Sequence, residues 1–569
     1  MAGITFRGKS AVQNHHLSVP FHELVPCPSQ SVTDELSLDD NLIIHGDNLI
    51  ALKALLPTHA GRVDLCFIDP PYNTGEEGWV YNDNVSSPLV RDWLNKEVGK
   101  DDLTRHDKWL CLMMPRLALI RELLTDDGAV FIAIDDNEYH RLRMLMDEVF
   151  GEDNFVATLV WQARKSVQND TDISQSHNYV LAYAKNRRQT ERRLKKANAG
   201  YWFSMAGFVF LPIAIDADKY SNPDNDTRGP WKADPFDAPG VRANLSYEIV
   251  NPNTHRAYLP PNGRHWRMEE SKYLAALADS RVLFGTRGTS KPQLKVFLNE
   301  QEEFGSIDTT WWGEGAFSYY VDALGDVEEA EELTDYGTTT DGSKLLQAMF
   351  GGDKVFPNPK PIQLVMRILE QASHADAIIL DSFAGSGTTG HAVLQLNSID
   401  QGNRRFILIE CEEYADSLTA ERIRKAIAGI PDSSSPYLAG TGGSFTYMEL
   451  GDALTIARLL EGEALPTFGD LARYVFFTAT GRDLDPAVVD SATGYVGETE
   501  QYRVYLMYEP DREWLKSAAL TLERARALGE SGGKTRLVYA PSRFLDADQL
   551  ADLNIQYCQL PFDIFRLRG

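Results

Sequence analysis

The sequence predicts an α/β protein built around a mostly parallel sheet with helices on both faces. The first observation is an apolar run at 65–68, typical of a buried strand, that ends on Asp-Pro-Pro-Tyr at 69–72. The second is a similar run at 377–380 that leads into Asp381 and a glycine-rich turn. The third is an alternation of strand and helix patterns along the chain, which indicates parallel strands joined by crossover helices.

The Asp-Pro-Pro-Tyr stretch sets the direction of the chain and places three chemical groups at the end of a strand. Because proline cannot donate to a β-ladder, Pro70 and Pro71 must carry the chain out of the sheet. The Asp69 carboxylate, the Pro70 carbonyl and the Tyr72 ring then lie where ligands bind in open α/β sheets. Two acceptors and a flat ring suit an amine on a flat group, and a nucleobase fits. The alternative is a plain Pro-Pro turn that closes the strand.

The second motif is the run Asp-Ser-Phe-Ala-Gly-Ser-Gly-Thr-Thr-Gly at 381–390. Its glycines let the backbone approach a ligand closely, and the start of the following helix favours negative charge. The next strand, 405–410, ends on Glu410, whose carboxylate can accept hydrogen bonds from both hydroxyls of a ribose. No lysine follows the glycines, so a phosphate-binding Walker loop is disfavoured. Taken alone, this motif resembles a dinucleotide site.

The two motifs together resemble those of S-adenosylmethionine-dependent amino-methyltransferases of DNA. The tetrapeptide at 69–72 precedes the glycines at 381–388, which is similar to the permuted order of the β class. Gly-Asp-Asn-Leu (46–49), Asn-Pro-Asp-Asn-Asp-Thr-Arg-Gly-Pro-Trp (222–231) and Pro-Asn-Pro-Lys-Pro (357–361) further resemble the modification subunits of type III restriction systems. The resemblance covers nearly the whole chain. It implies a Rossmann-like methyltransferase fold, a mixed and mostly parallel sheet, with an inserted target-recognition domain and a small C-terminal α/β domain.

The resemblance also implies a reaction, a cofactor and partners. The reaction would be methyl transfer from S-adenosylmethionine to the N6 amine of adenine in double-stranded DNA, with the base flipped out of the stack. A helicase-nuclease restriction subunit and a second copy of the chain are further partners that it allows. Aspartate at the first motif position leans toward adenine, but N4-cytosine methylation stays open. Two further hypotheses also stay open: a recognition subunit that only places a nuclease partner, and methylation of RNA.

Roles for individual residues follow from the resemblance. Asp69 and the Pro70 carbonyl would accept the two amine protons, Pro71 belongs to the same tetrapeptide, and Tyr72 would stack on the base. The residues expected to cradle the methionine end of the cofactor are Phe383, Ala384, Gly385, Ser386, Gly387 and Thr388. The other expected cofactor contacts are Asp381 near the amino group, Glu410 on the ribose, Asp47 on the adenine amino group, and Lys360. Asp47 equally suits a helix cap. No metal site is expected.

Length and composition limit the class of protein. A chain of 569 residues is too long for a single core and suggests three or four domains. The five cysteines are scattered without disulfide or metal-ligand spacing, which fits a reducing cytoplasm. No secretory signal opens the sequence, and its longest apolar run, 201–215, falls short of the roughly 20 residues of a membrane span. We therefore expect a cytoplasmic protein without a membrane partner.

The charge distribution indicates where DNA would bind. The net charge is −26, yet residues 151–300 carry +5. A basic cluster in this segment comprises Arg187, Arg188, Arg192, Arg193, Lys195 and Lys196. Further basic residues, interleaved with aromatic ones, are Arg228, Lys232, Arg242, Arg256, Arg264, Arg267, Arg287 and Lys291. These side chains are candidates for contacts with phosphates and base edges, although a solvated helix face is an equal alternative for the first cluster.

We predict five segments along the chain. They are a polar surface arm (1–40), a catalytic half of the methyltransferase domain (41–185), a target-recognition domain (186–350), a cofactor-binding half (351–430) and a C-terminal accessory domain for docking or dimerisation (431–569). The expected elements include a helix over 103–124, a strand over 128–134, a hairpin of 154–161 with 177–184, and an amphipathic helix over 512–528. A polar loop over 75–100 would cover the site.

Overall fold

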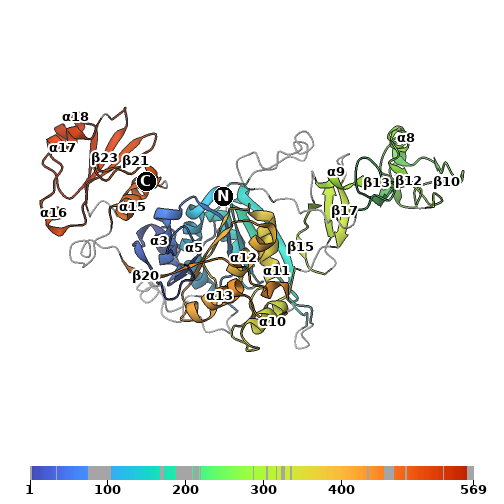
Figure 1. Cartoon of the computed structure of the whole chain (residues 1–569), viewed down its shortest axis with the longest axis horizontal. Coiled ribbons are helices and arrows are strands. Elements are labelled where there is room, and N and C mark those ends of the chain that lie inside the picture. Colours follow the sequence, from blue (N-terminus) through green and yellow to red (C-terminus); the bar gives the residue numbers. More distant parts are fainter. Residues whose placement is uncertain are drawn as a thin grey trace.

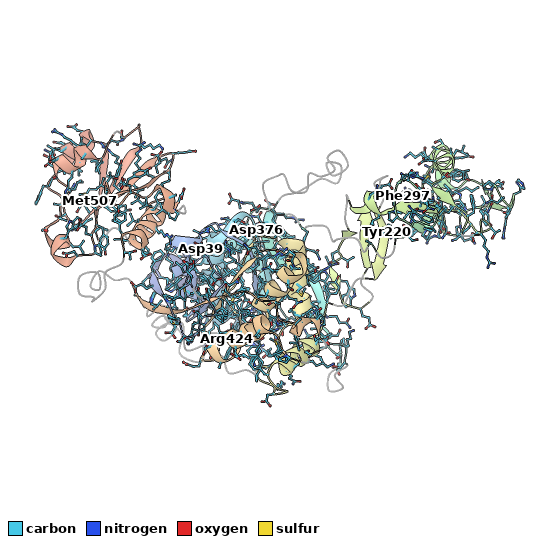
Figure 2. The ribbon with its side chains drawn as sticks, in the orientation of Figure 1. Asp39, Tyr220, Phe297, Asp376, Arg424 and Met507 are labelled. Carbon is cyan, nitrogen blue, oxygen red and sulfur yellow. The ribbon has the colours of Figure 1, made fainter. Side chains whose placement is uncertain are left out.

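The computed structural model describes three folded parts of the chain (Figure 1). The described residues are 3–33, 35–74, 104–166, 172–187, 208, 210, 217, 220–285, 287–302, 306–314, 317–321, 327–332, 336–431, 433, 435–453, 467–480, 484–529 and 531–560. In Figures 1 and 2 the inserted part, around Phe297, and the C-terminal part, around Met507, lie on opposite sides of a large central sheet. The predicted loop over 75–100 lies outside the described residues.

A ten-stranded sheet forms the centre of the molecule. Its strands, in spatial order, are β1 (His22–Pro26), β20 (Thr446–Ala453), β2 (Leu42–His45), β19 (Arg405–Glu410), β18 (Ile378–Asp381), β3 (Val63–Ile68), β4 (Leu124–Ile134), β6 (His177–Ala184), β5 (Phe155–Gln162) and β15 (Trp311–Trp312). The six strands from β20 to β4 run parallel, whereas β6 is antiparallel to both β4 and β5. The predicted hairpin and the mixed, mostly parallel sheet are thus confirmed.

Helices cover both faces of this sheet, as the sequence predicts. One face packs against α3 (Asn48–His59), α5 (Arg105–Leu123) and α6 (Tyr139–Val149), and the other against α11 (Ile362–Ala372), α12 (Thr388–Asp400) and α13 (Glu421–Ala428). Strand β3 shows why both faces are apolar. Its Cys66 and Ile68 side chains enter the first core, and Leu65 and Phe67 enter the second. A strand buried on both faces reads as a continuous apolar run, which is the pattern at 65–68.

The prediction that residues 1–40 form a polar surface arm is wrong for most of this segment. Two short helices, α1 (Lys9–Val12) and α2 (His15–Ser18), contact α5, and β1 pairs with β20 at the edge of the main sheet. Val12 and Phe21 are buried in the core. The apolar residues are spaced between polar ones in segments of only four or five residues, too short to show a helical or strand period.

Two predicted segment boundaries also differ from the structure. Strand β20 lies within the predicted C-terminal domain, yet it is parallel to β2 in the central sheet. Strand β15 and helix α10 (Thr339–Met349) lie within the predicted recognition domain, yet β15 pairs with β5 and α10 contacts α13. Sequence order does not show this because the chain leaves the central sheet and returns to it.

The inserted part consists of small antiparallel sheets around its own core. One sheet contains β12 (Val282–Leu283), β13 (Gln293–Phe297) and β7 (Trp231–Pro235), and α8 (Glu270–Ala278) lies beside it. A two-stranded sheet pairs β8 (Asp237–Pro239) with β11 (Arg264–Trp266). Another pairs β9 (Ile249–Val250) with β10 (Ala257–Tyr258). A further sheet holds β14 (Ser306–Ile307), β16 (Phe317–Val321) and β17 (Val327–Glu332). Phe236, Trp266 and Tyr273 form the centre of the core.

The C-terminal part is a small α/β unit, as predicted, that packs against the central domain. Its sheet is β21 (Tyr495–Glu498), β22 (Tyr502–Leu506), β23 (Thr535–Ala540) and β24 (Ile555–Gln559), and its helices are α15 (Phe468–Thr480), α16 (Arg512–Ser517), α17 (Leu522–Ala527) and α18 (Ala547–Asp552). Tyr474 of α15 meets Phe21 edge to face, with the ring centroids 4.4 Å apart.

The single helix predicted over 512–528 is wrong, because the structure has two short helices there. Between them Leu520 is fully buried and donates its backbone N–H to the Ser542 carbonyl at 2.8 Å. This long-range contact interrupts the helix. Within the parts of the chain that the structure describes, no helix combines the length and the apolar character needed to cross a membrane.

Candidate active site at the carboxyl ends of the central strands

A cavity of about 490 Å³ lies at the carboxyl ends of β18 and β3, where the two sequence motifs meet. The predicted site residues that line it are Asp69, Pro70, Pro71, Tyr72, Lys360, Asp381, Phe383, Ala384, Gly385, Ser386, Thr388 and Glu410. Asp47 and Gly387 are the two predicted residues that do not. Because β18 and β3 are parallel neighbours, residues more than 300 positions apart in the sequence enter one cavity.

Asp69 has one occupied and one open carboxylate oxygen. Its Oδ2 accepts from the Lys360 Nζ at 2.5 Å, and the side chain of Lys360 is 9 % exposed. Its Oδ1 is buried and accepts no hydrogen bond from a described residue. A buried oxygen without a donor is costly, so this atom is suited to a donor on a ligand. Lys360 lines the same cavity as the glycine turn, so its expected place near the cofactor stays a prediction; in the structure its ammonium group pairs with Asp69.

Tyr72 presents a ring beside this acceptor. The ring packs partly against the core, and the Lys360 Nζ lies 5.0 Å from its centroid. The hydroxyl lies beside Asp69 and Asn178, near enough to affect its acidity but outside hydrogen-bond geometry. Burial, together with the Asp69 carboxylate, raises the pKa of Tyr72 well above its ordinary value. The phenol therefore stays neutral, and its ring is the useful surface.

The glycine turn is fastened by two carboxylates at the ends of adjacent strands. Asp381 accepts from the Phe383 backbone N–H at 3.0 Å and from the Thr389 hydroxyl at 2.5 Å. Glu410 accepts from the Gly385 N–H at 2.7 Å. Gly385 has a φ of +51°, and a Cβ there would lie 3.1 Å from the Phe356 ring. The turn thus requires glycine both for its backbone conformation and for the space beside that ring.

Burial makes both of these carboxylates less acidic. It raises the pKa of Asp381 to about 7, although the hydrogen bonds from Thr389 and Phe383 oppose this. It also raises the pKa of Glu410 to about 7, against the three backbone N–H groups of residues 412, 385 and 411. Burial thus favours the neutral form of each group more than it is favoured in an exposed carboxyl group.

Sequence reasoning missed several residues that line the cavity. Phe356 and Tyr414 form a pair of rings 5.8 Å apart beside the glycine turn, and Asn178 and Asp135 lie on the side of Tyr72. Phe356 directly precedes the Pro-Asn-Pro-Lys-Pro stretch, and this position beside a motif could have identified it as a site residue. The other three residues have no local pattern that distinguishes them from ordinary strand and helix ends.

The Asp47 side chain caps a helix. It accepts from the backbone N–H groups of Leu49 and Ile50 at 2.8 and 3.2 Å, so it starts α3. The adjacent Asn48 donates to the Ser382 carbonyl at 2.8 Å and accepts from the buried Arg116. The segment around Asp47 thereby joins the first motif's half of the domain to the glycine turn. Its role toward a cofactor adenine stays a prediction.

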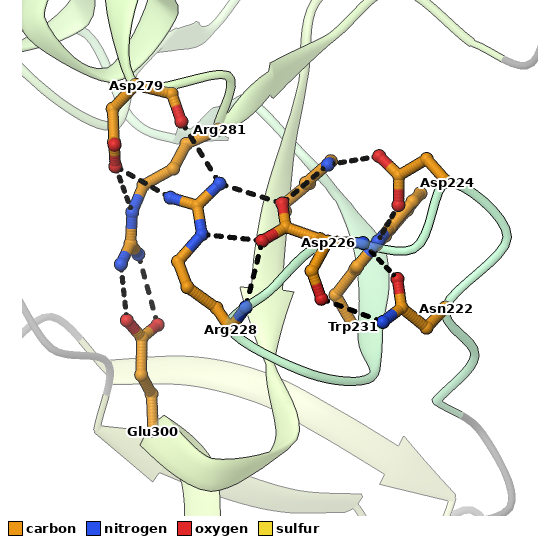
Figure 3. A network of polar contacts seen from close by, with 9 residues as sticks. Asn222, Asp224, Asp226, Arg228, Trp231, Asp279, Arg281 and Glu300 are labelled. Atoms are coloured by element: carbon orange, nitrogen blue, oxygen red, sulfur yellow. Dashed lines mark hydrogen bonds and ion pairs between the residues drawn. The ribbon is translucent and has the colours of Figure 1, made fainter.

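Many basic residues of the inserted part are ion-paired within that part. Arg228 pairs with Asp226 and Asp279, at 2.8 and 2.7 Å, in a network that also includes the buried Lys295 between Asp224 and Asp226 (Figure 3). Arg264 and Lys291 both pair with Asp237, and Arg267 lies 3.7 Å from Asp234. Among the described residues no carboxylate comes within ion-pair distance of Arg242, Arg256 or Arg287.

This pairing changes the interpretation of the basic residues. A guanidinium that is already neutralised by a carboxylate has less attraction left for a phosphate. The candidates for DNA contact in the insert are thus reduced to these three arginines. Of the basic cluster at 187–196 only Arg187 is described, and its guanidinium donates to the Phe155 carbonyl. The rest of the cluster lies outside the described residues.

Comparison with known proteins identifies the family. A family model for DNA methylases matches residues 63–421. The StyLTI Mod subunit, a type III restriction-modification enzyme of Salmonella typhimurium, is 32 % identical over 430 residues, which cover 73 % of this chain and 59 % of that protein. The EcoP15I Mod subunit of Escherichia coli is 28 % identical, with 67 % and 60 % covered. The type II methyltransferase M.KpnI of Klebsiella pneumoniae is 30 % identical, with 64 % and 79 % covered.

The matched region contains both motifs and all the cavity-lining residues named above. The chain belongs to the DNA methylase family. It spans about 60 % of the length of the two type III subunits that it resembles.

Proposed function

We propose that the chain transfers a methyl group from S-adenosylmethionine to the N6 amine of adenine in double-stranded DNA, as the modification subunit of a type III-like restriction system. The observation that carries the proposal is the open Oδ1 of Asp69 beside the Tyr72 ring, in the same cavity as the glycine turn. Two relatives of this chain are named type III Mod subunits, which supports the system type. A restriction subunit is therefore the expected protein partner.

The residues around the glycine turn fit the proposed cofactor. Glu410 offers carboxylate oxygens for ribose hydroxyls, and the Phe356 and Tyr414 rings offer flat apolar surface near it. The backbone of 383–388 allows close approach, and α12 begins at its end. When bound, S-adenosylmethionine supplies an electrophilic methyl group on a positively charged sulfur.

The residues of the first motif bind and orient the target amine. A base in a duplex must first be flipped out, because its amine is otherwise paired. Tyr72 then stacks on the base, Asp69 Oδ1 accepts one amine proton, and the Pro70 carbonyl accepts the other. Lys360 pairs with Oδ2 and so fixes which oxygen of Asp69 faces the amine. These contacts direct the nitrogen lone pair at the methyl group, and the rate comes mainly from positioning and electrostatics.

The proton balance follows from the same geometry. The bound cofactor would supply the methyl group as the N–C bond forms, and would keep the electron pair of the broken C–S bond on its sulfur. The nitrogen becomes positively charged, so its proton becomes acidic. Asp69 Oδ1, already hydrogen-bonded to that nitrogen, is the nearest acceptor for this proton.

Substitution of Asp69 by alanine tests the proposal. The purified chain is given tritiated S-adenosylmethionine and a random-sequence duplex library made by amplification, in which the amines of adenine and cytosine are unmethylated. Wild type should label the DNA, and nucleoside analysis should give N6-methyladenine. Asp69→Ala should not label it, but should bind S-adenosylmethionine in calorimetry nearly as wild type does. Asp126→Ala, which removes a carboxylate that is 85 % exposed, is the matched control.

Three results would change the proposal. N4-methylcytosine in place of N6-methyladenine would change the base but leave the roles intact. Labelling by Asp69→Ala at the wild-type rate would remove Asp69 from the mechanism. An inactive wild type that still binds the library would favour a recognition subunit without methylation.

A further inference from the structure

A fully buried carboxylate lies directly behind the Asp69–Tyr72 loop and has no role in the mechanism above. Glu138 follows β4 at the start of α6 and is 0 % exposed. It occupies the N-cap position of α6, yet its side chain makes no capping hydrogen bond. Instead it accepts from the Asn73 side-chain amide through Oε1, and the His106 Nδ1 lies 2.5 Å from the same oxygen. Arg141 lies 3.5 Å from Oε2.

Asn73, the residue after Tyr72, has an unusual backbone conformation. Its φ is +58°, in the left-handed region that residues other than glycine rarely adopt, although asparagine tolerates it better than most. The side chain is 3 % exposed, so its amide must find a partner inside the protein. The hydrogen bond to Glu138 supplies that partner and holds the chain in the turn that follows the tetrapeptide.

Helix α5 holds the same loop on either side of Asn73. The Trp109 Nε1 donates to the Pro71 carbonyl at 2.7 Å, and the Arg105 guanidinium donates to the Thr74 carbonyl at 2.8 Å. His106, on the same turn of α5, faces Glu138. The loop is therefore fixed at three points, and Glu138 is the only carboxylate among these described contacts.

Burying a carboxylate is expensive, and apolar residues of similar volume often stabilise a core better. The described polar contacts of the Glu138 side chain are with Asn73 of the catalytic loop, with His106 of α5 and with Arg141 of its own helix. We propose that Glu138 is a positioning residue, which acts through Asn73 to hold the Asp69 and Pro70 acceptors and the Tyr72 ring in the geometry that takes the target amine. This inference rests on the proposed function.

The size of the effect follows from the sensitivity of such geometry. A displacement of about 1 Å at a reacting group can lower a rate about 100-fold. Loss of the Glu138 contact frees Asn73 to leave its left-handed conformation, and the tetrapeptide directly precedes it. We expect the maximal rate of transfer to fall about 10- to 100-fold, with little change in affinity for S-adenosylmethionine or DNA.

The test is a double-mutant cycle on kcat with saturating S-adenosylmethionine and duplex library. Glu138→Ala removes the acceptor, and Asn73→Gly removes the donor but keeps the backbone conformation accessible. If Glu138 acts through Asn73, the double variant should be no slower than the slower single variant. Glu138→Gln keeps an oxygen that can accept from Asn73, and should recover part of the rate. Glu148→Ala, on the same helix α6 and paired with Lys9 at 2.8 Å, is the matched control and should keep full activity.

The possible failures are distinguishable. A wild-type chain that transfers no label contradicts the proposed function itself. An active wild type together with full-rate Glu138→Ala and Glu138→Gln contradicts the positioning role alone. Independent, multiplicative effects of Glu138→Ala and Asn73→Gly also contradict it. The positioning role is also contradicted if Glu138→Gln loses cofactor affinity and thermal stability as strongly as it loses rate, because that pattern indicates a general structural defect.

Discussion

Gly342, on the buried side of α10, packs against the backbone of the segment that contains Lys360. Its substitution therefore tests whether α10 holds Lys360 in place in the cavity. A Cβ at this position would lie 2.4 Å from the Pro359 carbonyl oxygen and 2.9 Å from the carbonyl carbon and oxygen of Lys360. Ordinary contact begins at 3.4 Å, so Gly342→Ala requires a movement of about 1 Å. The obstructing atoms belong to the backbone, which cannot rotate away as a side chain can.

Two opposing contributions to the free energy of unfolding decide whether Gly342→Ala is more or less stable than wild type. An alanine in place of glycine within a helix should stabilise it by about 1 kcal/mol. Overpacking against fixed atoms costs about 1–3 kcal/mol. We therefore expect a net loss of stability, the opposite of the helix-propensity expectation. Since the Lys360 backbone must move, its pairing with Asp69 should also suffer, and transfer should slow by about 100-fold.

Thermal unfolding and tritium transfer measure the two effects. Gly469→Ala is the matched control, because Gly469 is also helical and, among the described residues, a Cβ there would meet only the Thr467 hydroxyl, at 3.9 Å. The control should be slightly stabilised and fully active. A Gly342→Ala variant that is stabilised like the control, and as active as wild type, would refute the argument that α10 supports Lys360.

Three further predictions concern single side chains. Tyr72→Ala should slow methyl transfer because it removes stacking on the base, worth about 1–3 kcal/mol, whereas Tyr72→Phe should lower the rate only slightly. If both variants lose rate equally in the transfer assay, the hydroxyl and not the ring is the important group. Because burial raises the pKa of Glu410 from 4.5 to about 7, the folded chain binds this proton more tightly than the unfolded chain does. Stability in urea should therefore fall as pH rises from about 4.5 to about 7, and Glu410→Gln should reduce that fall; an unchanged profile would contradict the shift. Arg264→Ala should lower the unfolding temperature because it removes one of the two cations that pair with the buried Asp237. Arg256→Ala should instead weaken salt-dependent DNA binding at unchanged stability, and the reverse result would restore Arg264 as a DNA contact.

The parts of the fold that the sequence predicted are those with local causes. Two prolines after an apolar run force the chain out of a sheet, so the end of β3 could be placed to within a residue. Glycines before a helical pattern likewise marked the turn after β18. In a parallel sheet such strand ends share one edge, which is why two motifs far apart in sequence could be assigned to one site.

The rest depends on contacts that no local pattern contains. The Lys360–Asp69 pair joins residues 291 positions apart, and its existence decides which oxygen of Asp69 is open. The ion pairs of Arg264 and Arg267 could not be distinguished from DNA contacts by composition, because a basic residue reads the same in either role. The buried Leu520 interrupted a helix whose own sequence shows a continuous helical period.

Under the proposed function, the pairing of Lys360 with Asp69 also gives a reason why the tetrapeptide needs a second acceptor. With Oδ2 occupied, Asp69 offers a ligand one oxygen, whereas a primary amine presents two protons. The Pro70 carbonyl can take the other proton, because Pro71 has no N–H that would hold the chain in a ladder there. Two acceptors at this spacing suit the amines of adenine and cytosine equally. Under the proposed function, the choice between the two bases must therefore come from other residues that line the cavity, such as His177 and Asn178.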